Sequence, residues 1–225
     1  MTTGRPPDIW RPTKEQLAAA RGAFVPDVLA PGLDVLFCGI NPGLYSGAVG
    51  HHFARPGNRF WKALHGAGFT PRVLSPFEER RLLYHGLGIT NLVRRATASA
   101  DELSPEELVE GARRLRRRVR RFPPRFVAFL GLTAYRTSFG RPEAVPGPQE
   151  DRLAGASVWL LPNPSGLNAH HQLPDLIAGL RLLRKAVRGG PRASGLPVRS
   201  SAGETPRRRQ RSRARPAWPP PEPEP

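Results

Sequence analysis

The sequence predicts an α/β domain whose parallel sheet is covered by helices on both faces. Short apolar runs alternate along the chain with segments of helical periodicity, and turns rich in glycine or proline follow these runs. The chain has 225 residues, 39% of them hydrophobic, which is enough for one such domain with a polar tail.

Four short apolar runs have the length and composition of buried strands. The first run ends at a Gly-Ile-Asn-Pro-Gly turn, and a Pro-Asn-Pro segment breaks the last one sharply. Ligands of parallel α/β sheets bind at the carboxyl ends of the strands, so these two turns are the expected position of a functional site. The runs are residues 34–38, 89–93, 126–130 and 157–161.

Helices are expected before the first strand and between the strands. The clearest begins at Ser104, because Ser-Pro-Glu-Glu supplies a serine cap, a proline at the first position and a glutamate that completes a capping box. Thr13 and Gln16 predict a similar box for a short helix. Residues 44–55 show little periodicity and are expected to form a loop. The other helices are expected at residues 58–66, 78–84, 131–135 and 174–187.

The chain is strongly basic, with 35 lysines and arginines against 18 acids and a formal net charge of +17. Nucleic acid is the usual partner of such a protein, although a basic tail can also serve solubility alone. Residues 189–225 hold eight arginines, three acids and nine of the 27 prolines, and are expected to be disordered. Most of the positive charge therefore belongs to the domain. The arginines of residues 113–121 are expected on a solvated helix face first, and on a DNA-facing surface second.

The chain has one cysteine, Cys38, in the first apolar run. One thiol cannot form an intramolecular disulfide, which suits a reducing compartment, and a small buried hydrophobe is favoured over a nucleophile. The chain shows no apolar signal region, and no run approaches the roughly twenty residues of a membrane span. We therefore expect a cytoplasmic protein, associated with the nucleoid in a bacterium, with no membrane partner.

The turn after the first strand carries one carboxamide, that of Asn41. A carboxamide donates and accepts hydrogen bonds and does not ionise, so Asn41 could position a water or read a base edge but would be a poor general base. Asparagine before proline also stabilises turns, and spacing alone leaves both roles open. The second turn sets Leu167 in a polar stretch. An exposed leucine there could act as a wedge in a base stack, whereas the ordinary alternative is packing into the core.

Together these segments resemble the mismatch-specific uracil-DNA glycosylase and thymine-DNA glycosylase family, and most closely its bacterial G/U type. The resemblance extends over residues 26–187. It implies a three-layer α/β/α sandwich with a central, mainly parallel sheet, and a base-flipping mechanism. The segments that carry it are Gly39-Ile40-Asn41-Pro42-Gly43, Phe53-Ala54-Arg55-Pro56, Asn58-Arg59-Phe60-Trp61 and Asn163-Pro164-Ser165-Gly166-Leu167.

The resemblance also implies roles for single residues. Asn41 matches the catalytic asparagine of the family, which positions the attacking water. Phe53 matches the aromatic residue that stacks on the flipped base, and such stacking contributes about 1–3 kcal/mol. Gly166 and Leu167 match the wedge that fills the vacated stack. The remaining expected site residues are Ile40, Ser46 and Asn91 in the uracil pocket, and Asn163 and Ser165 as support from the second motif.

The implied function is a monofunctional DNA glycosylase that removes uracil, with thymine or ethenocytosine as further candidates, from mismatches with guanine in double-stranded DNA. Such an enzyme initiates base excision repair. No lysine lies in either loop, so water is the expected nucleophile. No carboxylate accompanies Asn41 in its turn, which predicts slow chemistry. Bacterial relatives often carry an arginine two residues beyond the wedge leucine, and Ala169 stands there in this chain.

The resemblance makes residues 26–188 the catalytic domain, with a lead-in over residues 1–25 and the tail over residues 189–225. No cofactor or metal is expected. The histidine pairs at residues 51–52 and 170–171 lack acid or cysteine partners at ligand spacing, and they are expected to contact phosphate or the flipped base. A monomer that binds double-stranded DNA is expected.

Three other classes of protein compete with this enzyme. A non-catalytic module that recognises mismatches would be expected to lack the polar side chain at position 41, which is present. An iron–sulfur uracil glycosylase needs four thiolates, and the chain has one cysteine. A nucleotide-binding α/β protein needs a glycine-rich phosphate loop, and no such motif follows the first strand.

Overall fold

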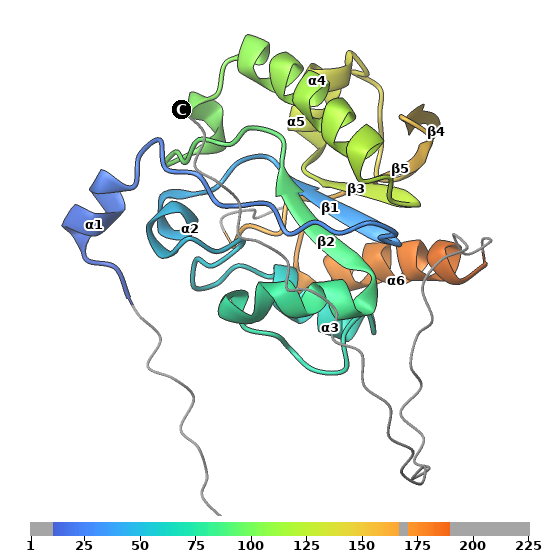
Figure 1. The fold of residues 1–225 in the computed structure, drawn as a ribbon, viewed down its shortest axis with the longest axis horizontal. Helices are drawn as coiled ribbons and strands as arrows, with labels where there is room; N and C mark the ends of the chain where they lie inside the picture. The colour runs from blue at the N-terminus through green and yellow to red at the C-terminus, as the bar shows by residue number, and fades with distance from the viewer. Residues whose placement is uncertain (1–10, 167–170, 190–225) are drawn as a thin grey trace, which may run out of the picture. The chain divides into compact units, whose positions relative to one another are not determined.

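A computed structural model of the chain describes residues 11–166 and 171–189. Its centre is a five-stranded sheet in the order β2-β1-β3-β5-β4, with helices on both faces (Figure 1). Four strands are parallel, and β4 pairs antiparallel with β5 at one edge. This confirms the expected three-layer fold with a mainly parallel sheet. The strands are β1 (Val35–Gly39), β2 (Leu87–Asn91), β3 (Phe126–Leu130), β4 (Gly147–Leu153) and β5 (Ala156–Leu161).

Two helices, α1 and α4, begin at the caps that the sequence predicts. The hydroxyl of Ser104 accepts the N–H of Glu107, and that of Thr13 accepts the N–H of Gln16, and each capping box is complete. No helix within the described residues is long and apolar enough to cross a bilayer. The helices are α1 (Lys14–Ala19), α2 (Leu44–Val49), α3 (Phe60–Gly66), the 3-10 helices η1 (Pro76–His85) and η2 (Ala100–Glu102), α4 (Pro105–Arg121), α5 (Leu132–Phe139) and α6 (Leu173–Gly189).

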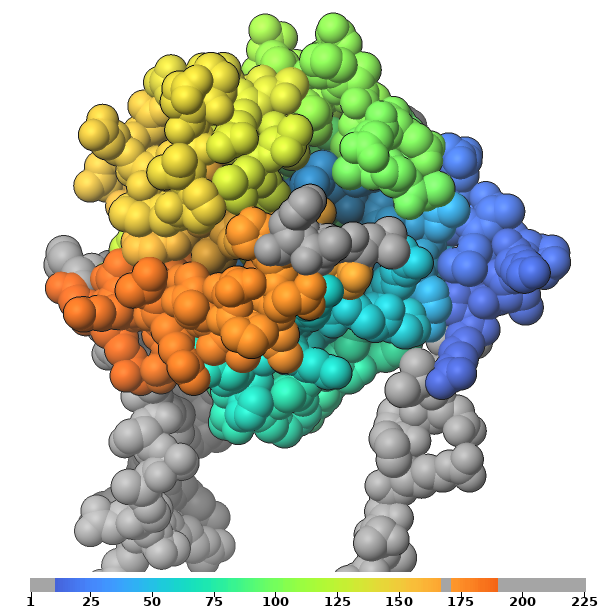
Figure 2. All heavy atoms as spheres, turned by 180° about the vertical axis from the view of Figure 1, so that it is seen from behind, coloured from blue at the N-terminus to red at the C-terminus, as the bar shows by residue number. Residues whose placement is uncertain are grey.

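Two apolar clusters pack against the two faces of the sheet. Successive side chains of a strand point to opposite faces, so Phe37 packs against α3 and α6 whereas Cys38 packs against α4 and α5. Seen from behind, α6 in orange lies beside the segment that contains α3 in cyan (Figure 2). Burial raises the pKa of the Cys38 thiol far above its ordinary value. The interpretation of Cys38 as a small buried hydrophobe is therefore confirmed.

Helix α4 turns its apolar stripe to the sheet and most of its arginines to solvent. The buried stripe residues include Leu115 and Val119. Arg118 is the exception, because it lies inward and its Nε is 3.1 Å from Asp27 Oδ2, with only 14% of its side chain exposed. The expectation of a solvated arginine face thus holds for most of α4 and is wrong for Arg118.

The structure contains three elements that were not predicted from the sequence, and the shortest of them is the 3-10 helix η2. Helix α2 lies within residues 44–55, which were expected to be a loop. It has six residues, no side-chain cap and one buried residue, Ser46, so it shows no apolar stripe. Strand β4 is also unexpected. It is a polar edge strand that starts with Gly-Pro, and it turns into β5 through Ala154 and Gly155, both at positive φ. The second expected strand lies two residues earlier than predicted, at β2.

Candidate active site

A cavity of about 340 Å³ lies where the loops after the parallel strands meet. The turns after β1 and β5 and the carboxyl ends of β2 and β3 all contribute to its wall. This is the edge at which open α/β sheets bind ligands. It brings together most of the residues expected in the site, namely Ile40, Asn41, Ser46, Phe53, Asn91, Asn163 and Ser165.

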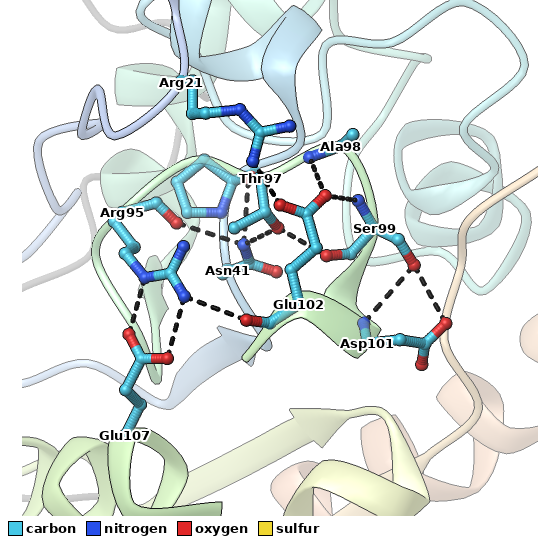
Figure 3. Close-up of polar contacts among 10 residues, drawn as sticks. Arg21, Asn41, Arg95, Thr97, Ala98, Ser99, Asp101, Glu102 and Glu107 are labelled. Atoms are coloured by element: carbon cyan, nitrogen blue, oxygen red, sulfur yellow. Dashed lines mark hydrogen bonds and ion pairs between the residues drawn. The ribbon is translucent and has the colours of Figure 1, made fainter. Parts of the chain in front are cut away.

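The amide nitrogen of Asn41 makes three hydrogen bonds within the protein. It donates to Pro42 O at 3.2 Å, to Arg95 O at 3.1 Å and to Thr97 Oγ1 at 2.7 Å (Figure 3). Carbonyl oxygens only accept hydrogen bonds, so these contacts identify which end of the carboxamide is the nitrogen. No described residue donates a hydrogen bond to Asn41 Oδ1. The oxygen is therefore available to a water or a substrate in the cavity.

Thr97 connects the turn of Asn41 to the segment after β2. Its hydroxyl accepts from Asn41 and donates to Ser99 O at 2.7 Å, and its side chain is buried. Its backbone N–H donates to Pro42 O, and its carbonyl accepts from the N–H of Leu44, both at 3.1 Å. Thr97 was not expected in the site, because none of its neighbours in sequence marks it as a partner of a turn 56 residues away.

Ion pairs hold the segment of Thr97 against the neighbouring helices. Arg95 makes two hydrogen bonds to the carboxylate of Glu107, at 2.6 and 2.8 Å, and these lower the pKa of Glu107 to about 2. Glu102 accepts the N–H groups of residues 98 and 99 and also pairs with Arg21 (Figure 3). The surroundings of Asn41 are thus attached both to the first turn of α4 and to the end of α1.

Phe53 lines the cavity from a strained backbone position. Its φ is +52°, in the left-handed region that a bulky residue rarely adopts. Its ring stacks on Phe60, with the ring centroids 4.3 Å apart and the planes at 30°. A Cβ at Gly39 would lie 3.2 Å from Phe53 Cζ and 2.5 Å from Asn91 Oδ1. Glycine is therefore required at position 39, at the end of β1, to leave room for both side chains.

Ser46 and Ile40 hold the pocket wall in place. Ser46 is buried, and its Oγ accepts the N–H of Ala54 at 3.1 Å, which ties α2 to the segment of Phe53. The carbonyl of Ile40 accepts the N–H of Val93 at 2.9 Å. Both residues line the cavity, as the resemblance implies.

Arg59 clamps the loop of the second motif. Its N–H donates to Pro164 O at 3.0 Å, and its guanidinium donates to His171 O at 2.6 Å and to Ser165 O at 3.4 Å. Arg59 thus contacts the chain on both sides of residues 167–170. Its place in the Asn-Arg-Phe-Trp segment was noted in the sequence, but this role was not predicted.

The turn of the second motif is tight at both Asn163 and Gly166. Asn163 Oδ1 accepts the N–H of Ser165 at 3.0 Å. A Cβ at Gly166 would lie 2.7 Å from Gly57 O, so only glycine fits there. Leu167 and Ala169 lie outside the described residues, and the expected roles at these positions stay predictions.

The histidines at residues 51–52 both contact other groups of the protein. His52 lines the cavity but is only 2% exposed, and both of its ring nitrogens are within hydrogen-bond distance of protein atoms. His51 Nδ1 lies 3.0 Å from the buried carboxylate of Glu79. His52 is thus too buried for a phosphate contact, but it lies in the cavity wall, so the other expected contact, with the flipped base, stays a prediction. In the described ranges, no three histidine, cysteine or acidic side chains gather as a metal site.

One carboxylate reaches the cavity from a distant part of the sequence. Asp101, in η2, lines the cavity and accepts a hydrogen bond from the Ser99 hydroxyl at 3.0 Å. The turn of Asn41 has no acid of its own, and the structure places this exposed one at the cavity wall. Lys62, the lysine nearest the motifs in sequence, is exposed on α3 and does not line the cavity.

Comparison with known proteins agrees with this arrangement. Residues 26–187 match the profile of the family described as Uracil DNA glycosylase superfamily. A solution NMR structure from Methanosarcina acetivorans, described as a candidate uracil DNA glycosylase, is similar with a TM-score of 0.50 and 20% sequence identity. The match covers 72% of this chain and 98% of that chain, and at this identity it concerns the fold. The chain belongs to the uracil DNA glycosylase superfamily, whose enzymes hydrolyse the N-glycosidic bond of uracil in DNA.

Proposed function

We propose that this protein is a monofunctional glycosylase that flips uracil out of double-stranded DNA and removes it where it faces guanine. The orientation of Asn41 carries the proposal. Its two amide hydrogens are shared among three protein acceptors, and its oxygen has no donor among the described residues. A fixed carboxamide oxygen beside a cavity is suited to hold one water in a defined direction.

The proposed reaction breaks the bond between C1′ of the sugar and N1 of uracil. The bonding electrons leave with the base, and the sugar becomes an oxocarbenium-like cation. The water held by Asn41 Oδ1 adds to C1′ and loses its proton to solvent. Because an amide does not take up a proton, Asn41 orients this water more than it activates it, and we expect slow chemistry.

Two features of the cavity support a base-flipping enzyme that uses water. Phe53 offers an aromatic platform whose ring is already held by Phe60, so little ordering is needed when a base stacks on it. No lysine is among the described residues that line the cavity, which favours water over an amine nucleophile. The net charge of +17 favours a polyanionic partner.

The preference for mismatches rests on the cost of opening a base pair. A G·U wobble pair opens more easily than a correct pair, so mispairing itself contributes selectivity. In the proposal Leu167, which follows Gly166 in sequence, fills the gap in the stack, and Arg59 holds the chain on both sides of residues 167–170. Because Ala169 stands where relatives often carry an arginine, the opposite guanine would be read by backbone groups of this turn.

The test is single-turnover base release from four substrates that differ only in context: G·U, A·U and G·T duplexes and single-stranded U. The wild type is compared with Asn41→Ala. Gln149→Ala is the matched control, because it removes a carboxamide from β4, outside the cavity. We expect release from G·U to exceed release from A·U and to fall by at least about a hundredfold in Asn41→Ala only.

The other outcomes lead to different conclusions. Equal release from all uracil substrates would retain the glycosylase and remove mismatch specificity. Tight binding of a G·U duplex without release from any substrate would make the protein a non-catalytic mismatch-binding module. Full activity of Asn41→Ala would contradict the role of Asn41.

A further inference from the structure

His52 and Asn91 form a buried pair in the wall of the cavity. His52 Nε2 lies 3.0 Å from Pro26 O, and His52 Nδ1 lies 3.2 Å from Asn91 Nδ2. The two residues are 2% and 5% exposed. Water therefore has little access to the two side chains, and their polar atoms bond to protein groups instead. Whether each atom donates or accepts then depends on its partner.

The direction of each hydrogen bond follows from the chemistry of its partner. Pro26 O can only accept, so His52 Nε2 carries the proton. In a neutral ring Nδ1 is then an acceptor, and the Asn91 atom that faces it must be the amide nitrogen. The Asn91 oxygen consequently points the other way, toward Gly39 and the edge of the Phe53 ring. No described residue donates a hydrogen bond to this oxygen.

We propose that His52 is a positioning residue that determines which bases the pocket accepts, because it holds Asn91 with its carboxamide oxygen toward the base. Uracil and thymine carry an N–H donor at ring position 3, which this oxygen can accept. Cytosine presents a lone pair there, which the oxygen repels. Cytosine is the normal partner of guanine, so a pocket that excludes it leaves correct base pairs intact. This inference rests on the proposed function of the site.

Burial favours the neutral form of His52, although the carboxylates around it favour the charged form. Glu79, from η1, accepts the His52 backbone N–H at 2.8 Å and also contacts His51, and Asp27 is paired with Arg118. Burial lowers the pKa of His52 and is the largest influence, ahead of Glu79 and Asp27, which raise it. Acid would protonate Nδ1, and Asn91 would then have to rotate and turn its amide nitrogen to the base.

The first experiment determines directly which nitrogen of His52 carries the proton, and it needs no mutation. Long-range ¹H–¹⁵N NMR of the full chain reports the tautomer of each histidine ring. We expect His52 at pH 7 to be neutral with the proton on Nε2. A ring protonated on Nδ1, or on both nitrogens, would overturn the proposal. This measurement does not depend on catalytic activity, so it stays informative if the proposed function fails.

The second experiment measures base discrimination with two duplexes that carry 5-fluorouracil or 5-fluorocytosine opposite guanine. The two bases have the same size and substituent and differ at ring positions 3 and 4. In His52→Phe, which leaves Asn91 free to rotate, we expect the ratio of single-turnover rates, fluorouracil over fluorocytosine, to fall by about tenfold or more. His52→Gln can accept from Asn91 and donate to Pro26, and we expect it to retain most of the ratio.

His51→Gln is the control, because it alters the adjacent histidine and its contact with Glu79 but not the contact with Asn91. The ratio should stay unchanged in this variant. In the wild type it should hold at about pH 6.5 and fall only at lower pH, because burial lowers the pKa of His52 below its ordinary value. An unchanged ratio in a folded His52→Phe protein would refute the positioning role. If the wild type releases neither base, the proposed function fails. The NMR result alone then decides whether His52 and Asn91 are oriented as proposed.

Discussion

The amide nitrogen of Asn41 donates to the hydroxyl of Thr97 at 2.7 Å and so joins two turns that are 56 residues apart in sequence. Thr97 passes the link on by donating to Ser99 O. The orientation of the residue that we place at the reaction centre therefore depends on a segment that carries no recognised motif.

Replacement of Thr97 by valine tests this link. Valine has the same shape but no hydroxyl, so Ser99 O loses its donor and Asn41 loses the shortest of its three hydrogen bonds. We expect stability to fall by about 1–3 kcal/mol and base release from G·U to fall by about tenfold, whereas Thr97→Ser should restore both. Urea unfolding and single-turnover assays measure the two effects. If Thr97→Val lowers stability but leaves the rate of base release unchanged, Thr97 has a structural role only.

The acceptors around Asn41 select an amide over a carboxylate. In Asn41→Asp, an oxygen would face the carbonyls of Pro42 and Arg95 at the positions where Asn41 now donates. We expect the pKa of the new carboxyl to rise and activity at pH 7 to be as low as in Asn41→Ala. Activity should recover in part at pH 5, because a protonated carboxyl can donate again. A variant as active as the wild type at pH 7 would contradict this account.

Arg59→Gln tests the clamp on the second loop. The variant loses the guanidinium contacts with His171 O and Ser165 O. If this loop carries the wedge, the loss matters only where a base must leave a duplex. We expect release from G·U duplex to fall by about tenfold and release from single-stranded U to change little. An equal loss on both substrates would indicate damage to the pocket instead.

The buried His52 predicts a dependence of stability on pH. Its pKa is lower in the folded protein than in the unfolded chain, so between these two values the unfolded chain binds more protons. The contribution of His52 is therefore fully present above about pH 6.5 and is lost as the pH falls toward the folded pKa. Urea unfolding from pH 7.5 to 5 should show a smaller decrease for His52→Gln than for the wild type. Parallel curves would contradict the lowered pKa.

The tail over residues 190–225 is proposed to hold DNA non-specifically. It carries eight arginines and three acids. We expect its deletion to weaken binding to undamaged duplex and to reduce the slope of log K against log salt, with single-turnover base release unchanged. A tail in which glutamine replaces all eight arginines should behave like the deletion. An unchanged salt slope would count against a DNA role.

The sequence predicted those parts of the fold that depend on neighbouring residues. Ser104 and Glu107 form their capping box within one helical turn, and the apolar run of β3 is itself the strand, Phe126–Leu130. Helix α2 and strand β4 were missed because each is stabilised by contacts made elsewhere in the fold. Helix α2 buries one side chain, and β4 is a polar strand that pairs with β5.

The same division applies to the candidate site. The two turns, Asn41, Phe53 and the pocket position of Asn91 were expected from short motifs and a resemblance, and the structure places them around one cavity. The sequence by itself determined which chemical groups stand at the carboxyl edge of the sheet. Only the tertiary structure decided how these groups are oriented, through Thr97 and His52, because a carboxamide is directed by hydrogen-bond partners that are near in space and distant along the chain.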